Sequence, residues 1–170
     1  IWARQKRVPG LWILDRIAIV TALTASFIRF GNLMNSEIVG EPAQVAWAFV
    51  FTKLDNIPRH PAQLYEALAY LATFVFLFFY FRKNHEKTPN GFFLGWFFAL
   101  IFGARFFIEF VKQSQTDITA ESALQMGQYL SIPFVIAGAG LVFYALRYGK
   151  VSPMPLKSGP NRNQQRRKKR

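Results

Sequence analysis

The 170-residue sequence has no cysteine, only two histidines, and nine acidic residues against 21 basic ones. Without cysteine, the chain cannot form a disulfide, bind a metal through thiolates or use a cysteine nucleophile of its own. The histidines, His60 and His85, are far apart and fall on opposite sides of the apolar segments, so they predict no metal site. We expect neither a metal ion nor another cofactor, and we assign His85 no role.

Long apolar runs dominate what is present. Hydrophobic residues make up 52% of the chain and aromatic residues 17%, more aromatic surface than a soluble domain of this size readily buries. The runs are about 18–20 residues long, the length that a bilayer requires. We predict an all-α fold, a polytopic membrane helix bundle with about four transmembrane helices, at about 11–30, 62–81, 92–111 and 128–146.

The chain divides into three parts. Residues 1–10 indicate the end of an earlier helix and a cytoplasmic loop, since an apolar start is followed by basic residues and a Pro-Gly breaker. With neither an initiator methionine nor a signal peptide, we expect an N-terminal part to be missing. Residues 11–148 form the transmembrane domain, and residues 149–170 are expected to be a basic, disordered cytoplasmic tail.

Within the transmembrane domain, the 31–58 segment is too polar, and too often interrupted by glycine and proline, to span. We expect a loop there, with a short re-entrant or interfacial piece at about 45–51. Asp15 and Arg16 are expected to reach the interface by snorkelling. Small residues suited to close helix packing lie in the third and fourth spans: Gly95, Gly103, Gly138 and Gly140.

The net charge of +12 comes largely from the C-terminus, since nine of the 21 basic residues lie between Arg147 and Arg170. A basic tail beside a span is better explained as an orientation signal than as a nucleic-acid site, so we expect membrane lipids and no nucleic acid as partners. With a cytoplasmic N-terminus, the outside loops hold only three basic residues: Lys53, Arg59 and Lys112. The polar motifs then converge on the outer face.

The first polar motif is Arg29, Asn32 and Asn35, which share roughly one side of a helix and are followed by Glu37 and Gly40. An arginine at mid-bilayer costs roughly 2.5–3.5 kcal/mol on insertion scales, so such residues usually face a wet or anionic cavity. Arginine offers a forked donor array for phosphate, and asparagine adds neutral donors. The alternative is an arginine that snorkels to the interface, with a polar loop after it.

Two further motifs open the second span and close the third. Arg105 and Glu109 can pair on one helix face, either as a structural ion pair or with Glu109 holding Arg105 toward an anionic ligand. His60 precedes Pro61, a residue favoured in the first turn of a helix. A histidine at this position can have a purely structural role as a helix cap. Glu66 lies inside the bilayer and is harder to explain structurally.

Together these motifs resemble the prolipoprotein diacylglyceryl transferase family over about residues 1–148. The family's Arg-x-Gly-Asn-x-x-Asn-x-Glu-x-x-Gly pattern fits 29–40, its His-Pro-x-Gln-Leu-Tyr-Glu pattern fits 60–66, and its Arg-Phe-x-x-Glu-Phe pattern fits 105–110. The sequence has Ile28 and Ser36 where the family usually has glycine, and it starts after the family's His-Gly-Gly segment.

The resemblance implies a transferase of the bacterial inner membrane that performs the first step of lipoprotein maturation. At the outer face, the diacylglyceryl group of phosphatidylglycerol moves to the lipobox cysteine thiol in the signal peptide of a preprolipoprotein. A thioether forms and glycerol phosphate leaves. Such a reaction needs cations on the departing oxygens and removal of the thiol proton. The substrate supplies the thiol, so the chain needs no cysteine.

Carried onto this sequence, the catalytic residues are Arg29 and Arg105, which stabilise the phosphate, and His60, the local candidate for the base. The family's histidine on the missing helix is the stronger candidate. Asparagine and glutamine would orient the head group, and the glutamates would hold or tune the arginines. The substrate-binding residues are Asn32, Asn35, Glu37, Gly40, Gln63, Tyr65, Glu66 and Glu109. All of this requires Arg29 and Arg105 to meet at one outward-opening, lipid-accessible pocket.

Three other interpretations stay open. A small membrane transporter or channel subunit would place polar residues toward both faces, whereas here they crowd toward one. A phosphatidyl transferase would carry an aspartate-rich metal motif, but Asp55 and Asp117 are far apart. A non-catalytic, lipid-binding fragment of a diacylglyceryl transferase is consistent with missing helices.

Overall fold

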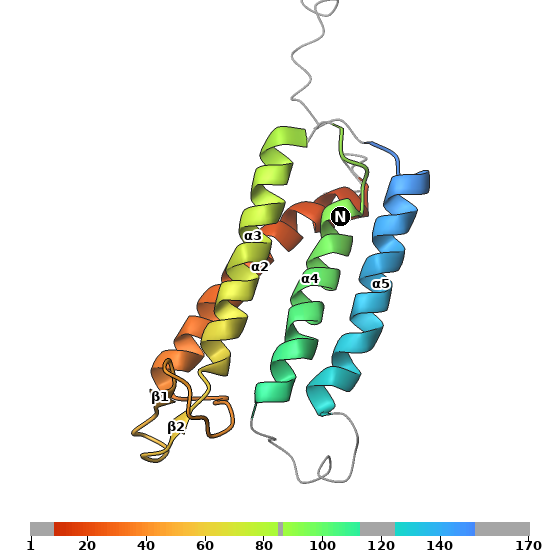
Figure 1. The fold of residues 1–170 in the computed structure, drawn as a ribbon. Coiled ribbons are helices and arrows are strands. Elements are labelled where there is room, and N and C mark those ends of the chain that lie inside the picture. The colour runs from red at the N-terminus through yellow and green to blue at the C-terminus, as the bar shows by residue number, and fades with distance from the viewer. Residues whose placement is uncertain (1–8, 85–86, 113–124, 152–170) are drawn as a thin grey trace, which may run out of the picture.

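A computed structural model of the chain describes residues 9–84, 87–112 and 125–151 (Figure 1). The described part contains the long helices α2 (Gly10–Asn35), α3 (Ala62–Asn84), α4 (Phe92–Ile108) and α5 (Met126–Tyr148). The short 3-10 helix η1 (Glu109–Val111) extends α4. Two short strands, β1 (Phe49–Val50) and β2 (Pro58–Arg59), pair antiparallel in the loop between α2 and α3.

All four long helices, counting α4 with η1, are long and apolar enough to cross a membrane. The prediction of a helical, multi-pass membrane fold is therefore confirmed, with the small hairpin as its one β element in the described residues. The expected cytoplasmic tail beyond residue 151, His85 and residues 1–8 lie outside the described residues.

Helices α3, α4 and α5 lie side by side, and α2 crosses behind α3 and α4 at a slant (Figure 1). The contact between α4 and α5 is made close by two glycines. A Cβ atom on Gly95 would lie 2.9 Å from the backbone nitrogen of Val142, and one on Gly138 would lie 2.7 Å from that of Ala99. Gly103 and Gly140 face open space, so the expected close helix packing holds only for Gly95 and Gly138.

Helix α2 runs past the predicted end of the first span and stops at Asn35. Gly31 does not interrupt it, because one glycine costs a helix only about 1 kcal/mol. Ser36 ends the helix in the left-handed conformation (φ 61°, ψ 35°), and its N–H bonds back to the carbonyls of Asn32 and Leu33. Glycine adopts that conformation without a Cβ clash, which explains why a related motif would favour glycine here.

The expected loop runs from Ser36 to Pro61 and contains no re-entrant helix, while the alternative of an interfacial piece stays a prediction. Residues 45–51 contain a turn and β1 instead. The loop is tied down at its base by Arg59, whose guanidinium lies 2.6 Å from Asp55 and also reaches the Gly40 carbonyl. This side chain is 6% exposed, so it is part of the loop's interior.

Asp15 is buried and does not snorkel. Its two carboxylate oxygens accept hydrogen bonds from the N–H groups of Gly91 (2.7 Å) and Leu94 (2.9 Å) at the start of α4. It therefore caps a helix far away in sequence, where the N-terminal N–H groups lack intrahelical partners and the helix dipole favours negative charge. Arg16 is half-buried: its guanidinium donates a 3.1 Å hydrogen bond to the Trp12 carbonyl and lies 3.9 Å from the Trp12 ring centre.

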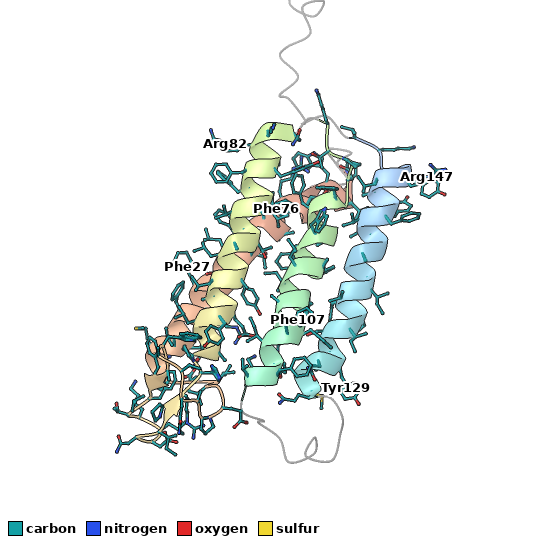
Figure 2. The ribbon with its side chains drawn as sticks, in the orientation of Figure 1. Phe27, Phe76, Arg82, Phe107, Tyr129 and Arg147 are labelled. Carbon is teal, nitrogen blue, oxygen red and sulfur yellow. The ribbon has the colours of Figure 1, made fainter. Side chains whose placement is uncertain are left out.

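The two ends of the bundle differ in charge. Arg82 and Arg147 lie at one end, and Tyr129 lies at the other, where α2 ends and α3 begins (Figure 2). Large apolar side chains between them point outward, among them Phe27 and Phe107, which are 65% and 71% exposed. In a membrane-spanning bundle these side chains face lipid or another helix.

Candidate functional site

The site is centred on Glu66, which lies one turn into α3 and is completely buried. One carboxylate oxygen is 3.0 Å from Nε of Arg29 on α2, and the other accepts a 2.8 Å hydrogen bond from Nζ of Lys112. The Arg29 contact is an ion pair rather than an aligned hydrogen bond. Two cations from separate elements thus neutralise one carboxylate, which a buried charge requires.

Lys112 continues the network to Glu109. Its Nζ lies 3.3 Å from a Glu109 oxygen, and only 4% of the residue is exposed. The Glu109 carboxyl packs against Gly127 in the first turn of α5, in the space that a Cβ atom would need. A helix N-terminus favours a carboxylate, so α5 also helps to hold Glu109.

Arg105 does not pair with Glu109, so the expected ion pair on one helix face is wrong. Among the described residues Glu109 has Lys112 as its cation. Arg105 and Arg29 instead both lie within electrostatic reach of the buried Tyr70 phenol on α3. Side chains at i and i+4 share a helix face, but the partner across the bundle decides where each one turns.

The two guanidinium groups, on α2 and α4, therefore both act electrostatically on the same buried phenol, and that of Arg29 is also within hydrogen-bonding reach of it. Counting the network's members gives three cations (Arg29, Arg105 and Lys112) and two anions (Glu66 and Glu109), hence one net positive charge. Such a cluster can accept one monoanionic group, such as a phosphodiester, with balanced charge. Its arginines would stabilise negative charge that develops on phosphate oxygens.

The other residues of the first motif lie at the end of α2. Gln63 is buried and donates a 2.6 Å hydrogen bond to the backbone carbonyl of Glu37. The side chains of Asn35 and Glu37 are exposed, and Asn32 is half-buried. Glu37 thus contributes its backbone, and the described structure gives it no arginine partner. The head-group roles of Asn32, Asn35 and Gln63 stay predictions.

His60 belongs to a neighbouring group of aromatic side chains. Its Nδ1 lies 3.1 Å from the Tyr65 hydroxyl, which also accepts a 2.8 Å hydrogen bond from Nε1 of Trp47. Among the described residues His60 makes no side-chain hydrogen bond or ion pair with Arg29 or Arg105.

Gly40 is a point of close backbone approach. Its N–H bonds to the His60 carbonyl (3.0 Å), and a Cβ atom there would lie 2.7 Å from the Val111 carbonyl oxygen. Gly40 also forms an antiparallel bridge with Lys112. The structure therefore gives Gly40 a visible role in joining the loop to the end of α4, next to the charged network.

An open apolar groove of about 710 Å³ runs between α3 and α4. Its walls include Ala69, Thr73 and Phe76 from α3 and Gly103, Ala104 and Phe107 from α4. Figure 2 labels Phe76 and Phe107 on its two walls. Arg105 directly follows the lining residue Ala104 in sequence but does not itself line the groove. An open apolar groove suits an apolar chain better than a polar solute.

Sequence reasoning missed Lys112 and Tyr70. The sequence predicts Lys112 only as a basic residue in an outside loop. Its position three residues after Glu109 on a helix was the available signal, since lysine is almost never fully buried unless paired. Nothing in the sequence pattern marks Tyr70. Within the described ranges no group of three or more histidine, aspartate or glutamate side chains is placed to hold a metal ion.

Comparison with known proteins gives one consistent result. The family described as "Prolipoprotein diacylglyceryl transferase" matches residues 1–144. Proteins named phosphatidylglycerol–prolipoprotein diacylglyceryl transferase are 47% identical over 150 residues in Bacteroides fragilis and 48% identical over 150 residues in Tolumonas auensis. A third, from Chloroherpeton thalassium, is 44% identical over 140 residues.

These alignments cover 88%, 86% and 82% of this chain, but 53%, 58% and 52% of the three relatives. The chain therefore spans about half the length of the curated relatives that it matches.

Proposed function

Because this chain belongs to the prolipoprotein diacylglyceryl transferase family, we propose that it carries the phosphate-binding part of an enzyme that attaches diacylglyceryl groups to proteins. The donor would be phosphatidylglycerol and the acceptor the lipobox cysteine of a preprolipoprotein signal peptide. One observation supports this most directly: Arg29 and Arg105, on different helices, both act electrostatically on the same buried phenol, and an apolar groove lies between α3 and α4.

In the proposed reaction, the cysteine sulfur attacks the glycerol carbon that bears the phosphate. The carbon–oxygen bond breaks, a thioether forms and glycerol phosphate leaves with the electron pair of that bond. The thiol proton passes to a base. Negative charge grows on the phosphate oxygens as the bond breaks, and guanidinium groups held in a low-dielectric site stabilise it.

Arg29 is well placed for this role. It contacts Glu66 through Nε, so its two terminal nitrogens are not used by that carboxylate. Those nitrogens form the fork that matches two oxygens of a phosphate. The apolar groove between α3 and α4 would take the acyl chains, whose transfer from water into apolar surroundings is favourable.

We also propose that the site faces the outside of the bacterial inner membrane and that the C-terminus is cytoplasmic. The end of the bundle with Arg82, Lys83 and Arg147 lies opposite to the Glu66 network (Figure 2). Basic residues next to spans favour the cytoplasmic side. Cysteine-accessibility labelling of single cysteines introduced at Lys53 and Lys150 would test this, with external labelling expected at Lys53 alone.

The enzymatic test uses vesicles containing phosphatidylglycerol and a synthetic lipobox peptide, with the thioether product detected by mass spectrometry. We expect transfer with phosphatidylglycerol and none when phosphatidylethanolamine replaces it. Lack of transfer by an intact, folded enzyme with its proper donor would rule out the proposal.

A second candidate is a lipid-binding unit that needs further residues for catalysis. One observation favours it: among the described residues His60 makes no side-chain hydrogen bond or ion pair with Arg29 or Arg105, and the carboxylates of Glu66 and Glu109 are already paired with cations. The same assay, run on this chain and on a version carrying the upstream segment of its relatives, separates the two. Transfer by the longer protein alone, with equal phosphatidylglycerol binding by both, would support the second candidate.

A further inference from the structure

We propose that Lys112 is a positioning residue of this site, which holds Glu66 and thereby keeps the fork of Arg29 available for phosphate. The inference rests on the proposed function and adds to it a residue outside all three sequence motifs.

The first step concerns the two oxygens of Glu66. Arg29 approaches one oxygen through Nε (3.0 Å), while the Lys112 ammonium lies 2.8 Å from the other. An arginine and a carboxylate left to themselves often form a bidentate pair, with two parallel N–H···O bonds. That pairing needs both oxygens. With Lys112 on the second oxygen, Glu66 contacts Arg29 at Nε and does not occupy its two terminal nitrogens; Tyr70 also lies within hydrogen-bonding reach of this guanidinium.

The second step concerns how firmly Lys112 is placed. It is 4% exposed, follows η1 directly and forms a backbone bridge with Gly40. Its N–H bonds to the Glu109 carbonyl at 3.2 Å, and its Nζ lies 3.3 Å from the Glu109 side chain. Backbone and ammonium are thus both held. Because Glu66 itself is fully buried, solvent does not compete for either oxygen.

The third step concerns what removal would do. Without the ammonium, Glu66 is free to rotate onto a second nitrogen of Arg29 and close the bidentate pair. The guanidinium would then be turned and partly neutralised. A small misplacement of a group that stabilises the transition state is costly in rate. Substrate binding by the lipid's acyl chains would change little, so the loss should appear in kcat more than in KM.

The experiment uses the full-length enzyme in phosphatidylglycerol vesicles with a lipobox peptide. Lys112→Met removes the ammonium but keeps the length of the side chain, and Lys112→Arg restores a cation with several donors. The matched control is Lys53→Met, which removes a lysine charge from an exposed position in the loop at the same end of the bundle. Thermal unfolding of each variant identifies any loss of fold.

We expect Lys112→Met to lower kcat by about 10- to 100-fold, with Lys112→Arg recovering most of it and Lys53→Met within about twofold of wild type. A double-mutant cycle with Glu66→Gln tests whether Lys112 affects kcat through Glu66. If Lys112 acts through Glu66, adding Lys112→Met to Glu66→Gln should cost little more.

Independent, multiplicative losses in the two variants would overturn the inference, as would full activity of a folded Lys112→Met enzyme. If that variant does not fold, Lys112→Gln takes its place in the same cycle, since it keeps a donor without the charge. Absence of thioether product from the wild-type protein would count against the proposed function instead. The two failures are therefore distinguishable.

Discussion

The two ends of the helix bundle each bury a carboxylate, and they neutralise it in different ways. At one end, Asp15 accepts hydrogen bonds from two backbone N–H groups at the start of α4. At the other, Glu66 is held between the side chains of Arg29 and Lys112. Asp15 accepts hydrogen bonds from backbone N–H groups that are free at the start of every helix. Glu66, in contrast, brings together two cationic side chains from different elements.

The difference teaches how to separate structural from functional buried charge in a membrane bundle. Asp15 completes the hydrogen bonding of α4, so its removal should cost stability and leave any site intact. The Glu66 network leaves one net positive charge and an arginine fork that the Glu66 carboxylate does not occupy. Its removal should cost activity. The predictions below test this contrast.

The largest expected effect is that of Arg29→Lys at the Glu66 end. Lysine keeps the charge but cannot contact Glu66 and present a fork at once. We expect transfer to fall by about 10²–10³-fold, as when one donor to a developing anion is lost. The rate of thioether formation measures this, with the fold checked by circular dichroism. Activity near that of wild type would remove Arg29 from the mechanism.

Next is Gly40→Ala, which attacks the same end through the backbone. A methyl group would meet the carbonyls of His60 and Val111, so the loop must move away from Lys112. We expect about a tenfold loss of activity, since a small displacement of positioned groups is enough. The control is Gly140→Ala, because that glycine faces open space and lies away from the groove. Equal effects of the two substitutions would contradict the assigned role of Gly40.

Asp15→Ala tests the opposite end. It leaves the N–H groups of Gly91 and Leu94 without their acceptor, at about 1–3 kcal/mol for an unsatisfied buried group. We expect a lower unfolding temperature in detergent and an unchanged specific activity of the folded fraction. Asp15→Asn, which keeps one acceptor oxygen, should lose less stability. Loss of kcat in a fully folded Asp15→Ala enzyme would erase the contrast between the two ends.

Ser36→Gly should have a small effect of the opposite sign. Ser36 has a positive φ of 61°, a conformation that costs a residue with a Cβ atom more than it costs glycine. We expect stability to rise by up to about 1 kcal/mol, with activity unchanged. Chemical unfolding measures it, and Gly31→Ala, inside the helix, serves as the complementary stabilising change.

The smallest effect is a pH dependence confined to the loop. Hydrogen bonds from Arg59 hold the pKa of the Asp55 carboxyl below its ordinary value. The pair's contribution is therefore present above the unfolded pKa of about 3.9 and is lost as pH falls through the lower folded value. Trp47 fluorescence should report loosening of the loop in that acid range. Asp55→Asn should show no such transition.

Much of this protein follows from its sequence. The four apolar helices were predictable because a bilayer sets a minimum length for a span. The motif around Arg29 was predictable because polar residues at membrane depth are costly. The end of α2 was missed by five residues, since propensity cannot say whether a lone glycine stops a helix when its neighbours still gain hydrogen bonds.

Sequence alone thus determined the class of fold, the spans and the family, because hydrophobic length and residue spacing are local properties of a chain. Only the tertiary structure determined the partners of the buried charged side chains. Glu66 forms ion pairs with both Lys112 and Arg29, and Glu109 pairs with Lys112 rather than with Arg105. Asp15 accepts hydrogen bonds from the backbone of α4. The physical reason is that a buried charge pairs with whatever the packing of other helices brings within about 3 Å, and spacing along one helix carries no record of that packing.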